Sequence, residues 1–344
     1  MLYVGLDYHV NGSSLCILDH GGKLVKQFRV NGRWPAVVEA VRRLAEEGDH
    51  RVAVAFEACG GCAVLYEELC KVAVRVGVAH PGHLRLIFKS KRKNDRVDAG
   101  KLAKLLYCDA IPRAHIPKAE VRQWRRLVEL RRVLVSRRTA VKNQLRGLLR
   151  TLGLESPRGL FTGKGVAAVE GQAMDDASGL ERDLLIEELK AAGERIRRVQ
   201  RELNRLAKDD PRVSLLMSVP GVGQRTAEAF VAYVDHVERF GRANQLGSYF
   251  GLVPCQDASA GRDRLGHITK EGPSSVRWLL IEAAWQAVRR DPGLKEMFQR
   301  LCGGKQERKK VAIVAIARHL GCAMGAMLRS GERWRSPDVK TKAA

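Results

Sequence analysis

The chain has 344 residues, with 61 Lys and Arg against 38 Asp and Glu, so its formal charge is +23. A hydrophobic fraction of 45% excludes a largely disordered protein, because such a chain can bury apolar cores. The length is typical of two domains with a connector. The positive charge favours a polyanionic partner such as nucleic acid or acidic lipid, although a basic enzyme with a small substrate stays open at this point.

The sequence does not show the patterns of secretion or membrane insertion. The first ten residues, MLYVGLDYHV, have no basic region and contain Asp7, so we expect no signal peptide. The apolar stretch over 311–327 contains Arg318 and His319 and is too short to span a bilayer. Eight cysteines spread over the chain favour reduced thiols over a disulfide framework. We therefore expect a cytoplasmic protein without a membrane partner.

Residues 1–112 predict an α/β domain. Three short β-rich segments come first, separated by glycine-containing hairpin turn signals, at residues 2–10, 13–20 and 23–31. Two helix–strand units follow, with apolar strands typical of a sheet covered on both faces, at residues 35–47, 51–58, 62–72 and 72–79. This order resembles the ribonuclease-H fold, although periodicity alone also fits other α/β sheets.

Residues 113–208 predict a long helical arm. Ten Lys and Arg but only two Glu fall within 119–150, with Leu and Val at three- and four-residue steps, which predicts a basic amphipathic helix over 119–154. A loop over 155–178 leads to a second helix over 179–208, and two long antiparallel helices would form a coiled-coil arm. The mixed charges on the second helix are as typical of a solvated surface as of a nucleic-acid contact. The positive charges on the helix over 119–154 repel one another unless phosphates screen them.

Residues 209–330 predict a mainly α-helical domain, followed by a flexible tail over 331–344. The segment Ser218-Val-Pro-Gly-Val-Gly223 resembles a helix–hairpin–helix turn, whose glycines let backbone amides approach a phosphate at a helix N-terminus. An ordinary glycine-rich turn is the alternative. Three tryptophans fall on helical patterns and are expected in the core rather than as base-stacking platforms: Trp124, Trp278 and Trp285.

Four carboxylates stand out by their positions. Asp7 lies in the first apolar strand, Glu57 ends the strand over 51–58, and Asp95 and Asp98 share one face of a predicted helix. In a ribonuclease-H-like sheet the first and fourth strands are neighbours and a late helix crosses their ends, so the four would converge. Clustered carboxylates favour Mg²⁺, with Mn²⁺ as the alternative, and these ions suit phosphoryl transfer. Each signal alone is also typical of a helix cap or a salt bridge.

The motifs around these acids resemble a known family. Tyr-Val-Gly-Leu-Asp7, Phe-Glu57-Ala-Cys-Gly-Gly and Asn-Asp95-Arg-Val-Asp98-Ala are similar to the DEDD motif of bridge-RNA-guided, Piv-like insertion-sequence transposases. Later segments are similar as well, including Tyr249-Phe-Gly-Leu-Val-Pro254 and Leu265-Gly-His-Ile-Thr-Lys270. The resemblance covers about residues 1–330. It implies a RuvC-like N-terminal domain, donor and target DNA as substrates, a guide RNA, and a homo-oligomer such as a dimer or tetramer.

The resemblance also implies a serine that attacks a DNA phosphate and holds a covalent intermediate. Ser259 matches that position by spacing after Pro254, although Ala258 replaces the serine that commonly precedes it. Lesser candidates are Ser248, Ser274 and Ser275. Residues expected to contact nucleic acid are bases or turn glycines near these motifs or on the basic helix: Arg92, Lys93, Arg131, Arg138, Lys142, Arg146, Gly221, Gly223, Arg262, Arg264, Lys270 and Arg277.

Other chemistry-bearing residues receive a structural interpretation. Cys59 and Cys62 have no second Cys or His pair at zinc spacing, which argues against a zinc site. The family resemblance implies Thr and an aromatic residue at these positions, so we interpret both cysteines as substitutions beside the acidic site. His9 and His267 could act as acid–base groups, but a lone His is more often structural. Two other functions stay open: a metal-dependent junction resolvase or nuclease that uses water, and a non-catalytic nucleic-acid scaffold.

Overall fold

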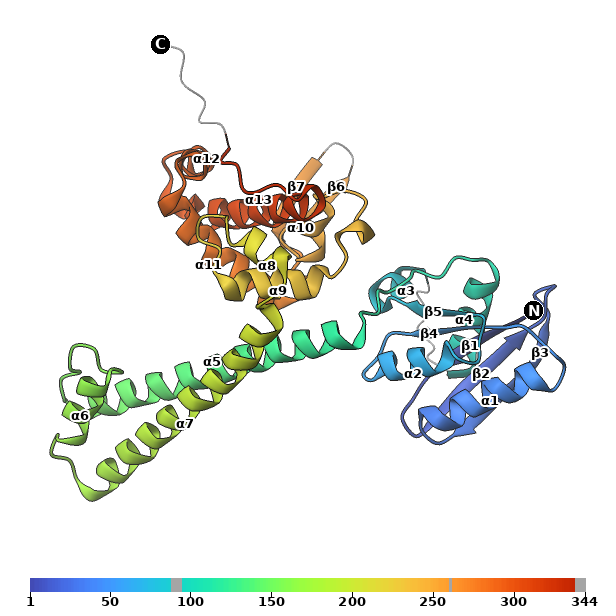
Figure 1. The fold of residues 1–344 in the computed structure, drawn as a ribbon, viewed down its shortest axis with the longest axis horizontal. Helices are drawn as coiled ribbons and strands as arrows, with labels where there is room; N and C mark the ends of the chain where they lie inside the picture. Colours follow the sequence, from blue (N-terminus) through green and yellow to red (C-terminus); the bar gives the residue numbers. More distant parts are fainter. Residues whose placement is uncertain (88–94, 260–261, 338–344) are drawn as a thin grey trace, which may run out of the picture. The chain divides into compact units, whose positions relative to one another are not determined.

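The protein divides into two compact units, Met1–Pro117 and Lys118–Ala344 (Figure 1). The structure is a computed structural model that describes residues 1–87, 95–259 and 262–337, with side chains in the last pair of strands described up to 257 and from 264. Each unit has its own hydrophobic core.

The first unit is built on a five-stranded mixed sheet. Its strands are β1 (Leu2–Asp7), β2 (Gly12–Leu18), β3 (Leu24–Asn31), β4 (Val52–Glu57) and β5 (Arg75–Ala79). The order is β3-β2-β1-β4-β5, with β1 antiparallel to β2 and parallel to β4. The five predicted strands are therefore confirmed, β1 and β4 are neighbours as predicted, and the order is compatible with a ribonuclease-H-like sheet.

Helices cover both faces of this sheet. They are α1 (Trp34–Glu46), α2 (Cys62–Leu69), α3 (Pro81–Ile87) and α4 (Asp95–Tyr107). Alternate residues of β4 point to opposite faces: Val54 and Phe56 belong to the core that includes α1 and α2, whereas Ala53 and Ala55 belong to a core that includes α4. The continuous apolar run of β4 thus reflects burial on both sides, as the sequence predicted.

Gly5 allows α4 to lie directly on β1. A Cβ atom at Gly5 would stand 2.0 Å from the carbonyl oxygen of Ala99 and 2.3 Å from the backbone nitrogen of Ala103. Any larger side chain would therefore push the helix away from the strand. Ala99 and Ala103 are fully buried and are themselves small, so the contact is one of backbone against backbone.

Two long helices, α5 (Ala119–Thr151) and α7 (Asp176–Ala207), pack along each other in the second unit (Figure 1). They confirm the two predicted helices. The connection between them contains α6 (Gly163–Glu170), where the sequence predicted only a loop. Leu145, Leu149, Val169 and Ile186 form a small core where these three helices meet. The helices of the arm belong to the same compact unit as the C-terminal helices.

The rest of this unit is mainly helical but contains one hairpin. Its helices are α8 (Pro211–Leu216), α9 (Gln224–Val234), α10 (Gln245–Tyr249), α11 (Ser274–Arg290), α12 (Pro292–Cys302) and α13 (Lys309–Ser330), with short 3-10 turns at Val237–Arg239 and Gln306–Arg308. Strands β6 (Pro254–Ser259) and β7 (Arg262–Ile268) pair antiparallel. This pair was not predicted because the segment is polar and mostly exposed, so it lacks the apolar alternation of a half-buried strand.

Helix α13 is the segment of the described chain that is long and apolar enough to cross a membrane by length and composition, counted over Gln306–Ser330. The prediction that this stretch is too short was wrong, because the helix continues to Ser330. Half of its most apolar window is buried, and Ile313, Ile316, Leu320 and Met324 belong to the core of the second unit. Such burial is typical of a core helix.

Residues 331–337 are the described part of the segment 331–344 that the sequence predicted as a flexible tail, and they make hydrogen bonds to the second unit. The Trp334 indole Nε1 donates a hydrogen bond to Asp291 Oδ2 at 2.9 Å, and the Ser336 hydroxyl donates to Asp291 Oδ1 at 2.7 Å. The backbone nitrogen of Trp334 also donates to Ser218 Oγ. These bonds fix the segment against α12 because the Asp291 carboxylate, at the start of that helix, is buried and accepts both.

Candidate active site

The four acids singled out in the sequence lie at one edge of the first unit. Asp7 ends β1 and Glu57 ends β4, and these strands run parallel with Leu6 opposite Phe56, so both acids leave the sheet at the same level. Asp95 and Asp98 stand in the first turn of α4, which packs on β1. Sheet topology and the close approach at Gly5 therefore bring the four acids together.

Asp7 is the centre of this cluster. Ligand atoms of Asp7, His9 and Asp95 all lie within 4.8 Å of one another, and His9 Nε2 is 3.5 Å from Asp7 Oδ2. Asp98 is also bound by Lys101, whose Nζ lies 2.7 Å from Asp98 Oδ1. Asp98 therefore makes a salt bridge, which the sequence analysis gave as the alternative to a role as metal ligand.

The electrostatics of Asp7 show how closely the negative charges are crowded. Burial raises the pKa of Asp7 above its usual value, His9 opposes the shift, and the charges of Asp95, Asp98 and Glu57 raise it further. A cation placed among these groups would relieve that repulsion. The donor set, carboxylate oxygens with one imidazole nitrogen, suits a divalent ion such as Mg²⁺ or Mn²⁺.

His9 is the member of the cluster that sequence reasoning did not assign. Its spacing of two residues from Asp7 was the available signal, because residues two apart on an extended chain project to the same side. The backbone of His9 is held by Ser13, whose hydroxyl accepts from the His9 nitrogen at 3.2 Å. This turn between β1 and β2 places the imidazole beside the acids.

Cys59 lies in the same electrostatic environment. Burial raises its pKa to about 11, with further contributions from Cys62, Glu57 and Asp7. The thiol therefore keeps its proton at neutral pH and is a poor metal ligand or nucleophile. Within the described chain, the potential metal cluster comprises Asp7, His9 and Asp95 and includes no cysteine.

Ser259 is the last residue of β6, opposite Arg262 in the register of the hairpin. The side chains of both residues lie outside the described part of the structure. Arg277 holds the base of this hairpin, because its Nη1 donates to the carbonyl oxygens of Phe250 at 2.9 Å and Glu271 at 2.7 Å. Arg277 is therefore engaged by the backbone on both sides of the hairpin.

The remaining serine and base candidates of this region differ in exposure. Ser248 on α10 and Ser274 at the start of α11 are exposed, whereas Ser275 is buried. Arg264 on β7 and Lys270 after it are exposed, as is His267.

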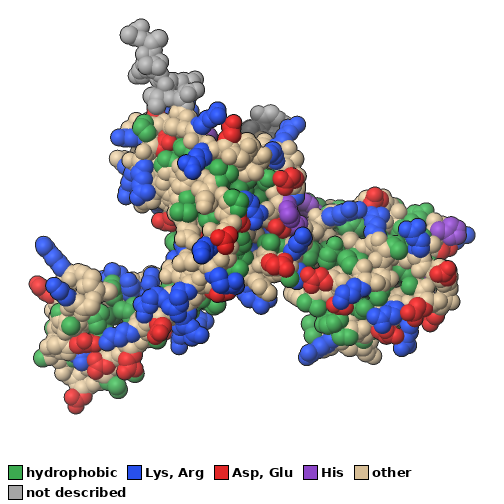
Figure 2. Space-filling view, in the orientation of Figure 1, with side chains coloured by type: hydrophobic (Ala, Val, Ile, Leu, Met, Phe, Trp, Pro, Cys, Tyr) green, Lys and Arg blue, Asp and Glu red, His purple; other side chains and the backbone are tan. Residues whose placement is uncertain are grey.

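The bases predicted on the first arm helix line α5, and Figure 2 shows Lys and Arg side chains along the arm. Arg131 and Arg138 are half-buried, and Arg146 is exposed. Lys142 Nζ lies 4.4 Å from the Phe161 ring centroid, and Arg146 stacks on the same ring at 4.7 Å. Arg92 and Lys93 lie outside the described residues.

The two turn glycines have different surroundings. Gly221 has a φ of +86°, and a Cβ there would stand 2.6 Å from the backbone nitrogen of Ala287. Close packing against α11 therefore explains Gly221 without a ligand. Gly223 precedes α9, and a Cβ at this position would have no described atom within 4 Å. The backbone at Gly223 therefore has free space beside it.

Comparison with known proteins adds the family. A family described as the IS116/IS110/IS902 transposases matches residues 213–299, and a DEDD-type IS110 transposase domain matches residues 4–153. A transposase of insertion sequence element IS1111A from Coxiella burnetii is 30% identical over 83% of this chain and 78% of its own. The chain belongs to the IS116/IS110/IS902 transposase family. It is thus an enzyme of the DNA transposase class.

Two other transposases are also similar to this chain. A probable family 20 transposase from Pseudomonas aeruginosa is 29% identical over 77% of this chain and 79% of its own. The transposase of element IS1328 from Yersinia enterocolitica is 29% identical over 67% of this chain and 69% of its own. The two matched segments of the transposase include the acidic cluster in one case and Ser259 in the other.

Proposed function

We propose that this transposase exchanges the DNA strands of an insertion sequence with Ser259 as nucleophile and a divalent metal held by Asp7, Glu57, Asp95 and Asp98. The observation that carries the proposal is the crowding of carboxylates around Asp7 at the ends of two neighbouring strands. A protein gains nothing from such repulsion in its folded state, so a function that uses a cation is its best explanation.

The chain's own groups have separate tasks in this mechanism. The Ser259 oxygen attacks phosphorus and forms a serine–phosphate bond as the bond from phosphorus to the 3′ oxygen breaks. The hydroxyl proton passes to solvent water, and the departing 3′ oxygen takes up a proton from water to become a hydroxyl. Arg262, Arg264 and Lys270 neutralise the phosphate, and Arg277 positions the hairpin. A bound Mg²⁺ or Mn²⁺ supplies charge stabilisation for phosphoryl transfer.

We further infer that the partners are donor DNA, target DNA and a guide RNA, and that the protein acts in the cytoplasm as a dimer or tetramer. The basic face of α5 supports nucleic-acid binding, and α5 with α7 supports a coiled-coil arm. Guidance by base pairing leaves no residue code in a protein, which then recognises mainly duplex shape and backbone.

Replacing the nucleophile tests the serine mechanism. Ser259→Ala should remove both the covalent protein–DNA adduct and strand exchange, measured by denaturing gel with labelled donor DNA. Ser156→Ala is the matched control, because Ser156 is an exposed serine of the same unit, lies in the loop before α6 and is not a candidate nucleophile. Unchanged cleavage by Ser259→Ala would support instead the nuclease that uses water.

Replacing the central acid tests the metal site. Asp7→Asn should lower strand exchange by about 10³-fold or more and should also weaken Mn²⁺ binding measured by calorimetry without DNA. Asp19→Asn is the control, because Asp19 is an acid of the same unit outside the cluster, and its Oδ1 accepts hydrogen bonds from the backbone nitrogens of Gly21 and Lys23 in the turn after β2. Strand exchange that survives Asp7→Asn would refute the metal site and favour a scaffold role.

A further inference from the structure

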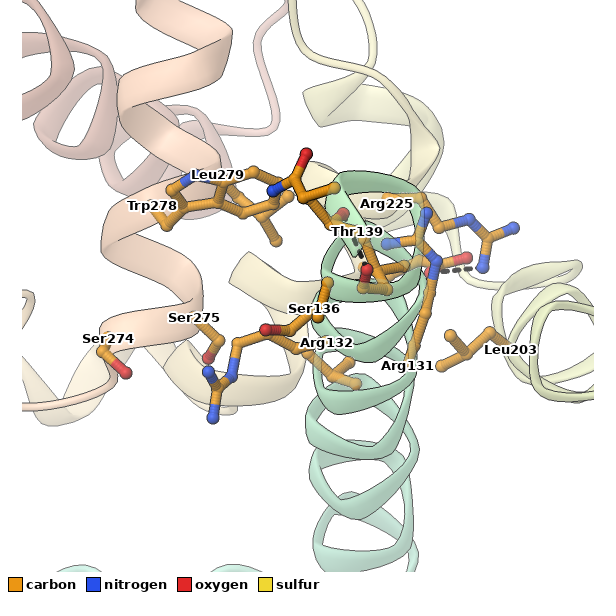
Figure 3. Close-up of a pocket in the computed structure, with 15 residues that line it drawn as sticks. Arg131, Arg132, Ser136, Thr139, Leu203, Arg225, Ser274, Ser275, Trp278 and Leu279 are labelled. Atoms are coloured by element: carbon orange, nitrogen blue, oxygen red, sulfur yellow. Dashed lines mark hydrogen bonds and ion pairs between the residues drawn. The ribbon is translucent and has the colours of Figure 1, made fainter. Parts of the chain in front are cut away.

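A cavity of about 640 Å³ lies in the second unit where α5 meets α9 and α11 (Figure 3). Its volume falls within the range of sites that take small organic molecules. Figure 3 shows Trp278 and Leu279 entering it from α11, Arg131 and Thr139 from α5, and Arg225 from α9. Its lining includes no residue of the acidic cluster or of the serine hairpin.

Trp278 supplies an exposed aromatic surface on this cavity. The side chain is 49% exposed, so the prediction that it lies in the core was wrong for this residue, whereas Trp124 is buried and Trp285 packs against Phe298. The reason is geometric: Trp278 stands two residues from the buried Leu280, about 200° round the helix. An indole that the fold leaves half in solvent is a suitable platform for stacking a flat ring.

The cavity also contains buried polar atoms without partners. Glu228 is 1% exposed and its Oε2 accepts from Arg225 Nη1 at 2.9 Å, but its Oε1 has no hydrogen-bond partner among the described residues. Burial raises the pKa of Glu228 to about 7, against the opposing charge of Arg225. A fraction of the carboxyl group is therefore protonated near neutral pH and can donate as well as accept.

A second buried atom with unused capacity comes from α5. Arg131 Nε is buried and, within the part of the chain that the structure describes, makes no hydrogen bond. Ser275 Oγ, on another lining residue, is a third such atom. Buried polar atoms are nearly always satisfied in folded proteins, so three unsatisfied atoms on residues that line one cavity indicate a missing polar ligand.

The cavity carries more positive than negative charge. Arg131, Arg132 and Arg225 line it, and Glu228 is the one acid among its described lining residues. Burial lowers the pKa of Arg131, and the like charges of Arg225 and Arg138 lower it further. Such crowding of guanidinium groups is relieved by an anion such as a phosphate.

We propose that this cavity binds an unpaired nucleobase, which stacks on Trp278, hydrogen-bonds through its edge to Glu228 and Arg131, and carries its phosphate among the arginines. A nucleotide combines the three properties that the lining requires: a flat apolar face, a polar edge and an anionic phosphate. A single-stranded DNA and an unpaired RNA segment share this chemistry. The site is independent of Ser259 and of the acidic cluster.

Binding of short oligonucleotides of one sequence tests the proposal, with single-stranded DNA, single-stranded RNA and duplex DNA measured separately by fluorescence anisotropy in EDTA. Trp278→Ala should weaken single-strand binding by about 5- to 150-fold, the effect of one stacked base. Trp278→Phe should restore most of the affinity, and duplex binding should stay within about twofold of the unchanged protein. The strand type that loses affinity identifies the source of the base.

Leu184→Ala is the matched control, because Leu184 is an exposed apolar residue of the same unit outside the cavity. Equal loss for single strands and duplex in Trp278→Ala, or no difference from Leu184→Ala, would overturn the proposal. Unchanged strand affinity with a smaller oligomer in light scattering would show instead that a second copy occupies the cavity. The absence of metal from these measurements keeps their outcome separate from that of strand exchange.

Discussion

The acidic cluster of the first unit and the cavity of the second are built in opposite ways. Topology makes the cluster: two parallel strands end side by side, and a helix held close by Gly5 adds two more acids. The cavity is made by helix faces, and its character depends on which side of α5, α9 and α11 each side chain occupies. Strand order therefore predicts which residues of a sheet lie together. In a site between helices, the orientation of each helix about its own axis decides which side chains line the site.

The largest effect on stability should come from adding a side chain at Gly5, where α4 lies directly on β1. Gly5→Ala puts a Cβ atom within 2.0 Å of the Ala99 carbonyl oxygen, so α4 must move. We expect a loss of about 1–3 kcal/mol in the free energy of unfolding, the usual cost of overpacking, together with weaker Mn²⁺ binding. Urea denaturation and calorimetry measure the two effects.

Gly60→Ala is the control for this change, because nothing lies within 4 Å of a Cβ at that position beside the same site. If Gly5→Ala has the stability and the Mn²⁺ affinity of the unchanged protein, the contact between α4 and β1 does not assemble the cluster.

The next effect concerns the buried acid of the cavity. The pKa of Glu228 is raised from 4.5 to about 7, so the fold favours the protonated form. Stability from this group is complete below pH 4.5 and is lost as the pH rises to about 7, by at most about 3 kcal/mol. Glu228→Gln should remove this loss, which thermal unfolding from pH 4.5 to 7.5 would detect.

Glu202→Gln is a suitable control, because Glu202 is a half-exposed acid on α7, outside the cavity, that pairs with Arg205. A decline of the same size in Glu228→Gln and in the unchanged protein would show that Glu228 does not hold its proton in the folded state.

The smallest effect should come from replacing a single basic side chain on the arm. Arg146→Gln removes one cation from the exposed part of α5, and we expect the slope of log affinity for duplex DNA against log salt to fall by about 0.9. Titration at several salt concentrations measures the slope. Lys190→Gln is the control, because Lys190 is paired with Glu170 at 3.1 Å. An unchanged slope in Arg146→Gln would remove that residue from the phosphate contacts.

The sequence was informative wherever hydrophobic periodicity was strong. The five strands of the first unit and the two long helices of the second follow from alternating or helical patterns, and the neighbouring positions of β1 and β4 follow from the strand order. The position of Asp7 and Glu57 at one edge could therefore be predicted from the sequence.

Other features could not be predicted from patterns. The hairpin of β6 and β7 buries little apolar surface, so its residues do not alternate, and Trp278 shares its helix with core residues although it faces solvent. The contact of Gly5 with α4 joins residues about a hundred positions apart and depends on backbone distances. His9 required knowledge of the turn that follows β1.

The short segment around Trp334 has a practical consequence for handling the protein. A truncation before Trp334 would remove the donors that satisfy the buried Asp291 carboxylate at the start of α12. Affinity tags and fluorescent fusions are therefore better attached after residue 337 than in place of the last dozen residues.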